Sequence, residues 1–270
     1  MNTLAAELRA ATVLSKEAMP LNYETAFPEV WQNLTAQVRG QLKGQSAAPV
    51  DERLIRQIVT QLCQASLQRF CAAKLSRAEA QQYWSNPQEP GNLPQDYLGA
   101  GLARSAHLLE LVRFCGLSEP RILELGCNAG RNLNFLYQAG YRRLSAIEIN
   151  PQAVALLRET YPELAACAEI HVAPIEDVIR NFADGAFDII FSLAVLVHVH
   201  YDSDWIFPEI ARAAGKYVIT IEDEANQTQR HFARNYREVF EGLGLRQIKV
   251  CDCCDLAGMD FYISRVFAKP

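Results

Sequence analysis

A glycine-containing segment between Glu124 and Asn132 carries the residue types and spacing of a ligand-binding turn. Gly126 and Gly130 lack a Cβ, so the backbone around them can approach a ligand closely and adopt φ values that other residues resist. A helix that starts after this turn would present unpaired N–H groups and its positive dipole end, which suit a carboxylate. We therefore expect a ligand at this turn.

A carboxylate, Glu148, lies 22 residues past Gly126, at the end of the next apolar segment. A carboxylate that ends the strand beside a glycine turn is placed to accept hydrogen bonds from both hydroxyls of a ribose. Ligands of open α/β sheets bind at this end of the strands. The pair of features indicates a nucleoside-containing ligand.

These residues must be positioned by an alternation of strands and helices that starts near residue 118. Short apolar runs predict strands, and helical patterns separate them, so a parallel sheet covered on both faces is expected. The last two predicted strands follow each other without a helix, which indicates antiparallel pairing. The predicted strands are Arg121–Gly126, Leu144–Ile149, Ile170–Ala173, Phe187–Leu193, Lys216–Ile221, Arg246–Cys251 and Phe261–Phe267. Helices are expected at Arg131–Ala139, Pro151–Tyr161, Glu176–Phe182, Trp205–Ala214 and Gln229–Gly242.

The region before residue 118 is expected to be helical. Apolar residues between Leu54 and Leu67 recur every three or four positions, and Asp51 is placed to cap that helix. Residues 76–79 form a capping box that opens a second helix, and a third runs over Leu102–Cys115. Residues 40–50 are typical of a linker. We therefore expect a helical cap over residues 1–117 and a ligand-binding domain over residues 118–270.

The segment Glu124-Leu125-Gly126-Cys127-Asn128-Ala129-Gly130 resembles the first motif of the class I S-adenosylmethionine-dependent methyltransferases, Glu/Asp-x-Gly-x-x-x-Gly. The resemblance runs from about residue 118 to residue 270 and includes the two consecutive closing strands. It implies a seven-stranded, mostly parallel Rossmann-like sheet with an antiparallel last strand. It also implies S-adenosylmethionine as cofactor and methyl transfer as the reaction.

The resemblance assigns roles to particular positions. The turn from Gly126 to Gly130 would wrap the methionine portion, Glu148 would bind the ribose, and Ile149 would pack on the adenine. The turn after the third strand would meet the adenine edge; here Pro174 replaces the usual aspartate, so Glu176 is preferred. The fourth strand would end between cofactor and acceptor. The expected cofactor-binding residues of these segments are Glu124, Gly126, Cys127, Asn128, Gly130, Asn132, Glu148, Ile149, Ile175, Glu176, Ser192 and Leu193.

The segment from Trp84 to Ser105 resembles the lead-in of small-molecule and sugar methyltransferases. By that likeness, Tyr97 and Arg104 would lie near the carboxylate of the cofactor. An equally weighted alternative places the tyrosine between domains and the arginine on a solvated helix face.

His198 is the candidate general base for the acceptor, because a neutral imidazole titrates near working pH and can take a proton from a hydroxyl. His200, Glu222, Asp223 and Glu224 are further candidates, and simple positioning is the alternative to any base. A histidine at this place can also serve only to cap or pack.

The sequence is most consistent with a small molecule as the acceptor of the methyl group, and an oxygen atom is favoured as the methylated atom. The Asn/Asp-Pro-Pro-aromatic signature of nucleobase-amine methylation is absent, since the matching place reads Ser192-Leu193-Ala194-Val195. The net charge is −5, and neither half shows the basic excess of a nucleic-acid-binding protein. A nicotinamide-dependent dehydrogenase would need glycine where Asn128 stands. A non-catalytic cofactor-binding module is the third possibility.

The eight cysteines are expected to be reduced thiols, and no metal site is expected, because the cluster Cys251-Asp252-Cys253-Cys254 lacks a second ligand pair. The longest apolar run, Ile189–Val199, is shorter than the ~20 residues of a membrane-spanning helix. No signal peptide is indicated, so a cytoplasmic location is expected. The sequence makes no prediction of oligomeric state.

Overall fold

The chain divides into two compact units in a computed structural model that describes residues 24, 28–45, 51–71, 74–99, 101–226, 228–256, 259 and 261–270. Residues 1–74 and 227–229 belong to one unit. Residues 75–226 and 230–270 belong to the other, which we call the sheet unit. The boundary expected at residue 117 therefore does not coincide with this division, because residues 75–117 belong to the sheet unit.

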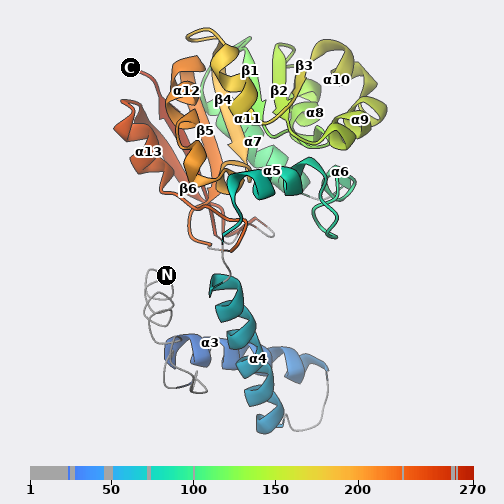
Figure 1. The fold of residues 1–270 in the computed structure, drawn as a ribbon, viewed down its shortest axis with the longest axis vertical. Coiled ribbons are helices and arrows are strands. Elements are labelled where there is room, and N and C mark those ends of the chain that lie inside the picture. The colour runs from blue at the N-terminus through green and yellow to red at the C-terminus, as the bar shows by residue number, and fades with distance from the viewer. Residues whose placement is uncertain are drawn as a thin grey trace. The chain divides into compact units, whose positions relative to one another are not determined.

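Among its described residues, the first unit contains the helices α3 (Pro28–Gln45) and α4 (Glu52–Cys71) (Figure 1). Asp51 caps α4 as predicted, since its Oδ1 accepts the N–H of Arg53 at 2.8 Å. The expected linker is helical as far as Gln45, and residues 46–50 lie outside the described residues.

The core between α3 and α4 uses only part of the predicted apolar stripe. Ile55 and Val59 of α4 are buried against Trp31 and Val38 of α3, together with Cys63. Leu54 and Leu62 lie one position away from this contact line and are exposed.

The sheet unit contains one seven-stranded sheet, in the order β3-β2-β1-β4-β5-β7-β6. The first five strands in the chain are parallel, and β7 lies between β5 and β6, antiparallel to both. The predicted mostly parallel sheet with an antiparallel ending is confirmed. The strands are β1 (Ile122–Leu125), β2 (Leu144–Glu148), β3 (Glu169–Val172), β4 (Phe187–Leu193), β5 (Ala214–Asp223), β6 (Arg246–Asp252) and β7 (Tyr262–Ala268).

Helices cover both faces of the sheet, and most begin within a few residues of the predicted positions. Three differ. The last helix begins at Tyr236 rather than near residue 229, because Asn235 caps it by accepting the N–H groups of Arg237 and Glu238. Two short helices, which begin at Asp96 and at Pro162, were not predicted from the sequence. The helices are α5 (Arg77–Ser85), α6 (Asp96–Gly99), α7 (Leu102–Phe114), α8 (Arg131–Gln138), α9 (Pro151–Thr160), α10 (Pro162–Cys167), α11 (Ile175–Val178), α12 (Ile206–Ala213) and α13 (Tyr236–Gly242), with 3₁₀ turns η1 (Ile179–Asn181), η2 (Leu196–His198) and η3 (Tyr201–Ser203).

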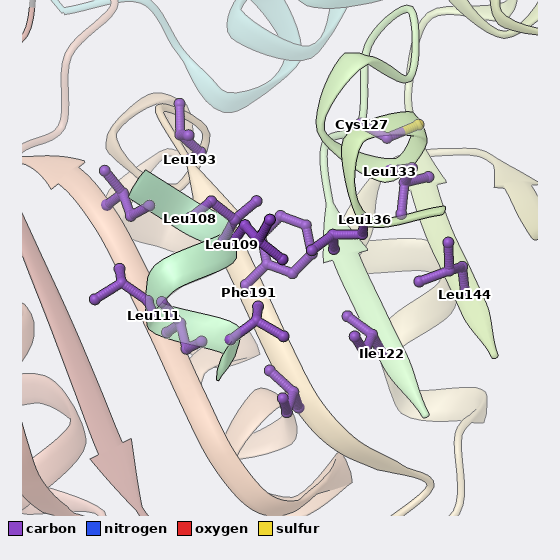
Figure 2. Packing of buried hydrophobic residues seen from close by; sticks show 14 of the residues in the cluster. Leu108, Leu109, Leu111, Ile122, Cys127, Leu133, Leu136, Leu144, Phe191 and Leu193 are labelled. Carbon is purple, nitrogen blue, oxygen red and sulfur yellow. The ribbon is translucent and has the colours of Figure 1, made fainter. Parts of the chain in front are cut away.

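The α7 helix is part of the sheet unit because its apolar side packs on the sheet. Figure 2 shows Leu108 and Leu109 beside Phe191 of β4, with Ile122 of β1 in the same cluster. Leu108 and Leu111 are at most 1% exposed. Full burial of one leucine side chain stabilises a fold by about 1.5–3 kcal/mol, so this face binds α7 firmly to the sheet.

Candidate active site

A cavity of about 570 Å³ lies at the carboxyl ends of β1, β2 and β4. The turn after β1, the last residue of β2, the turn after β3 and the end of β4 all contribute to its lining. Helix α5, which crosses the sheet unit at the ends of the strands (Figure 1), lines it from the other side. This is the position at which open α/β sheets bind ligands, and the size suits a drug-sized molecule.

The glycines of the β1 turn are required by packing within the protein. Gly126 and Gly130 have φ values of +71° and +78°. A Cβ on Gly126 would lie 2.6 Å from Val195, and one on Gly130 would lie 2.5 Å from Leu157. Protein side chains therefore occupy the space where a Cβ would lie at either glycine. Gly126 lines the cavity, and Gly130 does not.

Two other residues of the turn face the cavity. Cys127 and Asn128 line it. Asn128 has a left-handed φ of 46°, which asparagine tolerates better than most residues, and its Oδ1 accepts the N–H of Ala129 at 2.7 Å.

Glu148, the last residue of β2, joins the two turns that border the cavity. Its carboxylate accepts the N–H of Asn128 at 2.7 Å and the N–H of Asn150 at 2.8 Å. Burial raises the pKa of this carboxyl, while the backbone hydrogen bonds lower it. A carboxylate has about four acceptor positions, so both oxygens keep capacity for ligand hydroxyls.

Glu124 lies behind the turn and does not line the cavity. Its Oε1 accepts a hydrogen bond from Asn132 Nδ2 at 2.8 Å, and Asn132 Oδ1 accepts one from Ser105 of α7 at 2.8 Å. Burial raises the pKa of Glu124 to about 8, so this carboxyl is mostly protonated at neutral pH. Glu124 thus positions Asn132, which does line the cavity.

Tyr97, Arg104 and Arg131 line the cavity near the start of α8. Tyr97 and Arg104 were predicted from the sequence as site residues, and Arg131 was not. Arg131 is 9% exposed, and its Nε donates to Ser105 at 3.2 Å. A cation at a helix N-terminus opposes the helix dipole, and this unfavourable placement is the sequence signal that could have made Arg131 a candidate site residue.

The predicted adenine-binding residues gather at one edge of the cavity. Ile149, Ile175 and Glu176 line it, beside Pro174. Glu176 Oε1 accepts a hydrogen bond from Ser203 at 2.8 Å, which fixes the direction of the carboxylate.

At the end of β4, Leu193 lines the cavity, whereas Ser192 is fully buried behind it. Adjacent strand residues point to opposite faces, so the two could not both face the ligand. Ser192 donates to Glu222 at 2.7 Å.

The acidic candidates at the end of β5 do not line the cavity, and each one binds other groups of the protein. Glu222 accepts the N–H groups of residues 195–197 at 3.1–3.2 Å and so holds the loop that carries His198. Burial raises the pKa of Glu222 to about 7. Asp223 accepts the N–H groups of residues 225 and 226, and Glu224 pairs with Arg265 at 2.8 Å.

His198 lines the cavity with a defined tautomer. Its Nδ1 lies 3.0 Å from the carbonyl oxygen of Arg230, and because a carbonyl only accepts, Nδ1 carries the proton. Nε2 of the neutral ring is then unprotonated and can accept a hydrogen bond. Burial lowers the pKa of His198 to about 3, and the charges of the neighbouring His231 and Arg230 act in the same direction. The ring is therefore neutral throughout the physiological range.

His200 also lines the cavity, with the opposite tautomer. Its Nδ1 accepts the N–H of Asp202 at 3.0 Å, so Nε2 of the neutral ring carries the proton. Of the two histidines, only His198 offers an unprotonated Nε2.

Several lining residues were not among the site residues predicted from the sequence. Arg77, Gln81 and Trp84 lie three or four positions apart on one face of α5, where the predicted capping box starts the helix. Arg230 and His231 come from the segment before α13. Trp84, His198 and His231 form a ring cluster, with ring centroids 4.3 Å and 4.9 Å apart.

Within the described ranges, no cluster of three or more His, Cys, Asp or Glu side chains is arranged to hold a metal ion. Cys251 and Cys254 are exposed and Cys253 is buried, all as free thiols. No helix in the described part of the chain is long and apolar enough to cross a membrane.

Residues 123–219 match the family model described as a methyltransferase domain. A search of curated proteins finds no match. Among solved structures, 1,6-didemethyltoxoflavin-N1-methyltransferase from Burkholderia thailandensis, with bound 1,6-didemethyltoxoflavin and S-adenosylhomocysteine, is 14% identical over 83% of this chain and 93% of its own, with a TM-score of 0.54.

Two further structures have the same fold. A geranyl diphosphate methyltransferase in complex with GPP and sinefungin is 15% identical over 72% of this chain and 98% of its own, with a TM-score of 0.55. An S-adenosylmethionine-dependent methyltransferase from Mesorhizobium loti is 15% identical over 63% of this chain and 100% of its own, with a TM-score of 0.50. The chain therefore contains a methyltransferase domain over residues 123–219, built on a Rossmann-like sheet.

Proposed function

We propose that the cavity binds S-adenosylmethionine along the β1 and β2 turns and methylates a hydroxyl group of a small molecule. Three features of the lining suit the cofactor. Glu148 offers a carboxylate to the ribose hydroxyls. Ile149 and Ile175 offer apolar surface to the adenine, and Glu176 offers an acceptor to its amino group.

The carboxylate of the methionine portion would bind at the start of α8. The unpaired N–H groups of this helix favour an anion, and two arginines, Arg104 and Arg131, line the same end of the cavity. Ser105 holds the Arg131 side chain through Nε, which reduces the entropy cost of binding an anion there. Tyr97 lies beside them.

S-adenosylmethionine, when bound, would supply a methyl group whose bond to sulfur breaks as the acceptor oxygen takes it, with S-adenosylhomocysteine as the leaving group. His198 would accept a hydrogen bond from the acceptor hydroxyl at Nε2 and direct the oxygen lone pair toward the methyl group. A base with a pKa of about 3 cannot ionise a free hydroxyl, but it can take the proton once the oxygen has begun to form its new C–O bond and has become strongly acidic. The proton would then leave the oxygen for Nε2 late in the reaction.

The observation that carries the hydroxyl preference is the fixed tautomer of His198. Its Nδ1–H is bound to the Arg230 carbonyl, which leaves Nε2 as an acceptor that a hydroxyl can satisfy. The cavity volume of about 570 Å³, which the acceptor would share with the cofactor, favours a small acceptor.

A screen for released S-adenosylhomocysteine tests this proposal. The purified chain would be incubated with S-adenosylmethionine and matched small molecules that carry a hydroxyl, an amine or a thiol. We expect products methylated on oxygen, identified by mass spectrometry. Turnover confined to amines, thiols or nucleic acids would refute the hydroxyl acceptor while leaving the enzyme class intact.

A further inference from the structure

One buried carboxylate holds the segment that follows β4. We call residues 194–198 the β4 loop. Glu222, near the end of β5, is fully buried and accepts the N–H groups of residues 195–197 at 3.1–3.2 Å, with both of its oxygens taking part. Glu222 is not among the described residues that line the cavity, so it acts on the cavity through the β4 loop.

This arrangement uses the whole acceptor capacity of Glu222. An ionised carboxylate has about four acceptor positions. Four donors reach it, namely the three N–H groups of the β4 loop and the hydroxyl of Ser192, which donates at 2.7 Å. A protonated carboxyl carries an O–H donor in one of these positions, so one of the four donors would lose its partner. Ser192, Leu196 and Val197 are buried, and a buried donor without a partner is costly.

The β4 loop is strained at its first residue. Ala194 has a φ of +58°, in the left-handed region that residues with a Cβ rarely occupy. Such a conformation persists only where the surrounding structure holds it. The N–H of Ala194 is bound to the carbonyl of Ile221 at 2.9 Å, and the hydrogen bonds to Glu222 begin at the next residue. Glu222 therefore supplies much of the hold on this strained loop.

The β4 loop contacts both parts of the proposed active site. Ala194, Val195 and His198 line the cavity. Val195 also packs against the turn after β1, since a Cβ added to Gly126 would lie 2.6 Å from its side chain. That turn is the one that we assign to the cofactor, and His198, at the other end of the loop, is assigned to the acceptor. A shift of the loop would therefore affect both.

The charged and titratable groups near Glu222 keep their charge around neutral pH. Tyr236 of α13 and Tyr262 of β7 both interact with Glu222, and burial raises the pKa of each phenol. Arg234, whose charge acts on Tyr236, keeps its positive charge. His198 is neutral, since its pKa is about 3. A change of charge within this group near neutral pH would therefore belong to Glu222.

Glu222 itself is balanced between its two forms at neutral pH. Burial raises its pKa to about 7, although the hydrogen bonds from Ser192 and from the β4 loop lower it. Because these hydrogen bonds favour the ionised carboxylate, ionisation in turn favours the loop conformation that makes them.

We propose that Glu222 is a positioning residue of the active site: its ionised carboxylate holds the β4 loop with Val195 against the cofactor turn and His198 in the cavity. Protonation of Glu222 weakens this hold, so the site binds its cofactor more tightly above neutral pH than below it. The proposal rests on the proposed function, because that function assigns the two ends of the loop to cofactor and acceptor.

An NMR titration of the wild type tests the hold on the loop. The backbone amide signals of residues 195–197 should change together, with one midpoint near pH 7, because the three N–H groups share one carboxylate. Glu222→Asp keeps a carboxyl and should keep a shared titration, whereas Glu222→Gln should lose it. The titration should remain in His198→Ala and His200→Ala, since neither imidazole is the titrating group. Ser192→Ala removes a hydrogen bond that lowers the pKa of Glu222, so its midpoint should lie at higher pH.

Calorimetry with S-adenosylhomocysteine tests the link between Glu222 and the site. We expect the wild type to bind this product at least about fivefold more tightly at about pH 8.5 than at about pH 5.5, the lower end of ordinary coupling between two sites. In Glu222→Gln the ratio of the two affinities should be clearly smaller. His200→Ala, which leaves the carboxylate in place, should keep the wild-type ratio.

The outcomes separate the two proposals. If S-adenosylhomocysteine does not bind the wild type, the proposed function fails, and the role of Glu222 fails with it. If it binds, three results would refute the role of Glu222 alone: equal affinity at both pH values, a ratio unchanged in Glu222→Gln, or amides of residues 195–197 that do not titrate together. The wild-type titration and its shift in Ser192→Ala decide the question even where Glu222→Gln does not fold.

Discussion

Replacement of His198 by alanine is the sharpest test of how the acceptor is activated. The variant removes Nε2, the acceptor nitrogen left free by the hydrogen bond from Nδ1 to the Arg230 carbonyl. Proton transfer by a positioned side chain contributes about 10²–10⁴-fold to a rate, so kcat should fall by that factor. The affinity for S-adenosylmethionine should barely change. His200→Ala is the matched control: its Nε2 carries the proton, so kcat per folded molecule should stay near the wild-type value.

The pH dependence separates this account from the expectation drawn from the sequence. An imidazole with an ordinary pKa of 6.5 would give a rate that rises with pH through the neutral range. Because burial lowers the pKa of His198 to about 3, His198 should contribute no ionisation to the kcat profile between about pH 6 and 9. A neutral-range ionisation that disappears in His198→Ala would refute the buried, neutral imidazole. Unchanged kcat in that variant would refute its role as base.

The same pKa predicts how His198 affects stability. The unfolded chain protonates this residue near pH 6.5, whereas the folded chain does so only near pH 3. Between these values the unfolded state binds more protons, so the free energy of unfolding should fall as pH falls through this window. In His198→Ala, the free energy of unfolding from urea denaturation curves should fall less steeply between these pH values than in the wild type.

Three further predictions concern the cofactor, the fold and metals. Glu148→Ala should weaken S-adenosylmethionine binding by about 1.5–3 kcal/mol in calorimetry, the scale of charged hydrogen bonds, and unchanged affinity would contradict the ribose assignment. Gly130→Ala should destabilise the sheet unit by about 2–4 kcal/mol, because the left-handed φ and the contact with Leu157 both act against a Cβ. Gly140 has a φ of +101° and open space around it, so Gly140→Ala should lower the free energy of unfolding by less. Equal decreases for the two variants in denaturation curves would refute the packing argument. Metal analysis of the purified chain should give no stoichiometric zinc, and one zinc per chain that is lost on replacing Cys253 would overturn this.

The fold could be predicted from the sequence because hydrophobic period and strand length are local properties. Each of the seven strands was placed within a few residues, and Asp51 and Ser76 marked the starts of their helices. The domain boundary could not be predicted in the same way. A helical pattern shows that Leu108 and Leu111 share a face, but it does not show that the sheet is what they pack against.

The lining of the cavity was predictable where its residues are close in sequence or end a strand, as with Asn128, Glu148 and Leu193. Ser192 was expected to line the cavity, but its side chain is buried. A strand predicted to within one residue does not show to which face of the sheet each side chain points, because neighbouring residues point to opposite faces. Arg230 and His231 reach the cavity from a segment without a motif or a period, so only the three-dimensional fold brings them to His198.

A crystal structure with S-adenosylhomocysteine bound tests the central claim most directly. We expect the ribose hydroxyls within hydrogen-bond distance of the Glu148 carboxylate, the adenine between Ile149 and Ile175, and the amino-acid carboxylate near Arg104 and Arg131. The sulfur should then face the space bordered by His198. A nucleoside bound elsewhere, or a ribose with no contact to Glu148, would contradict the account.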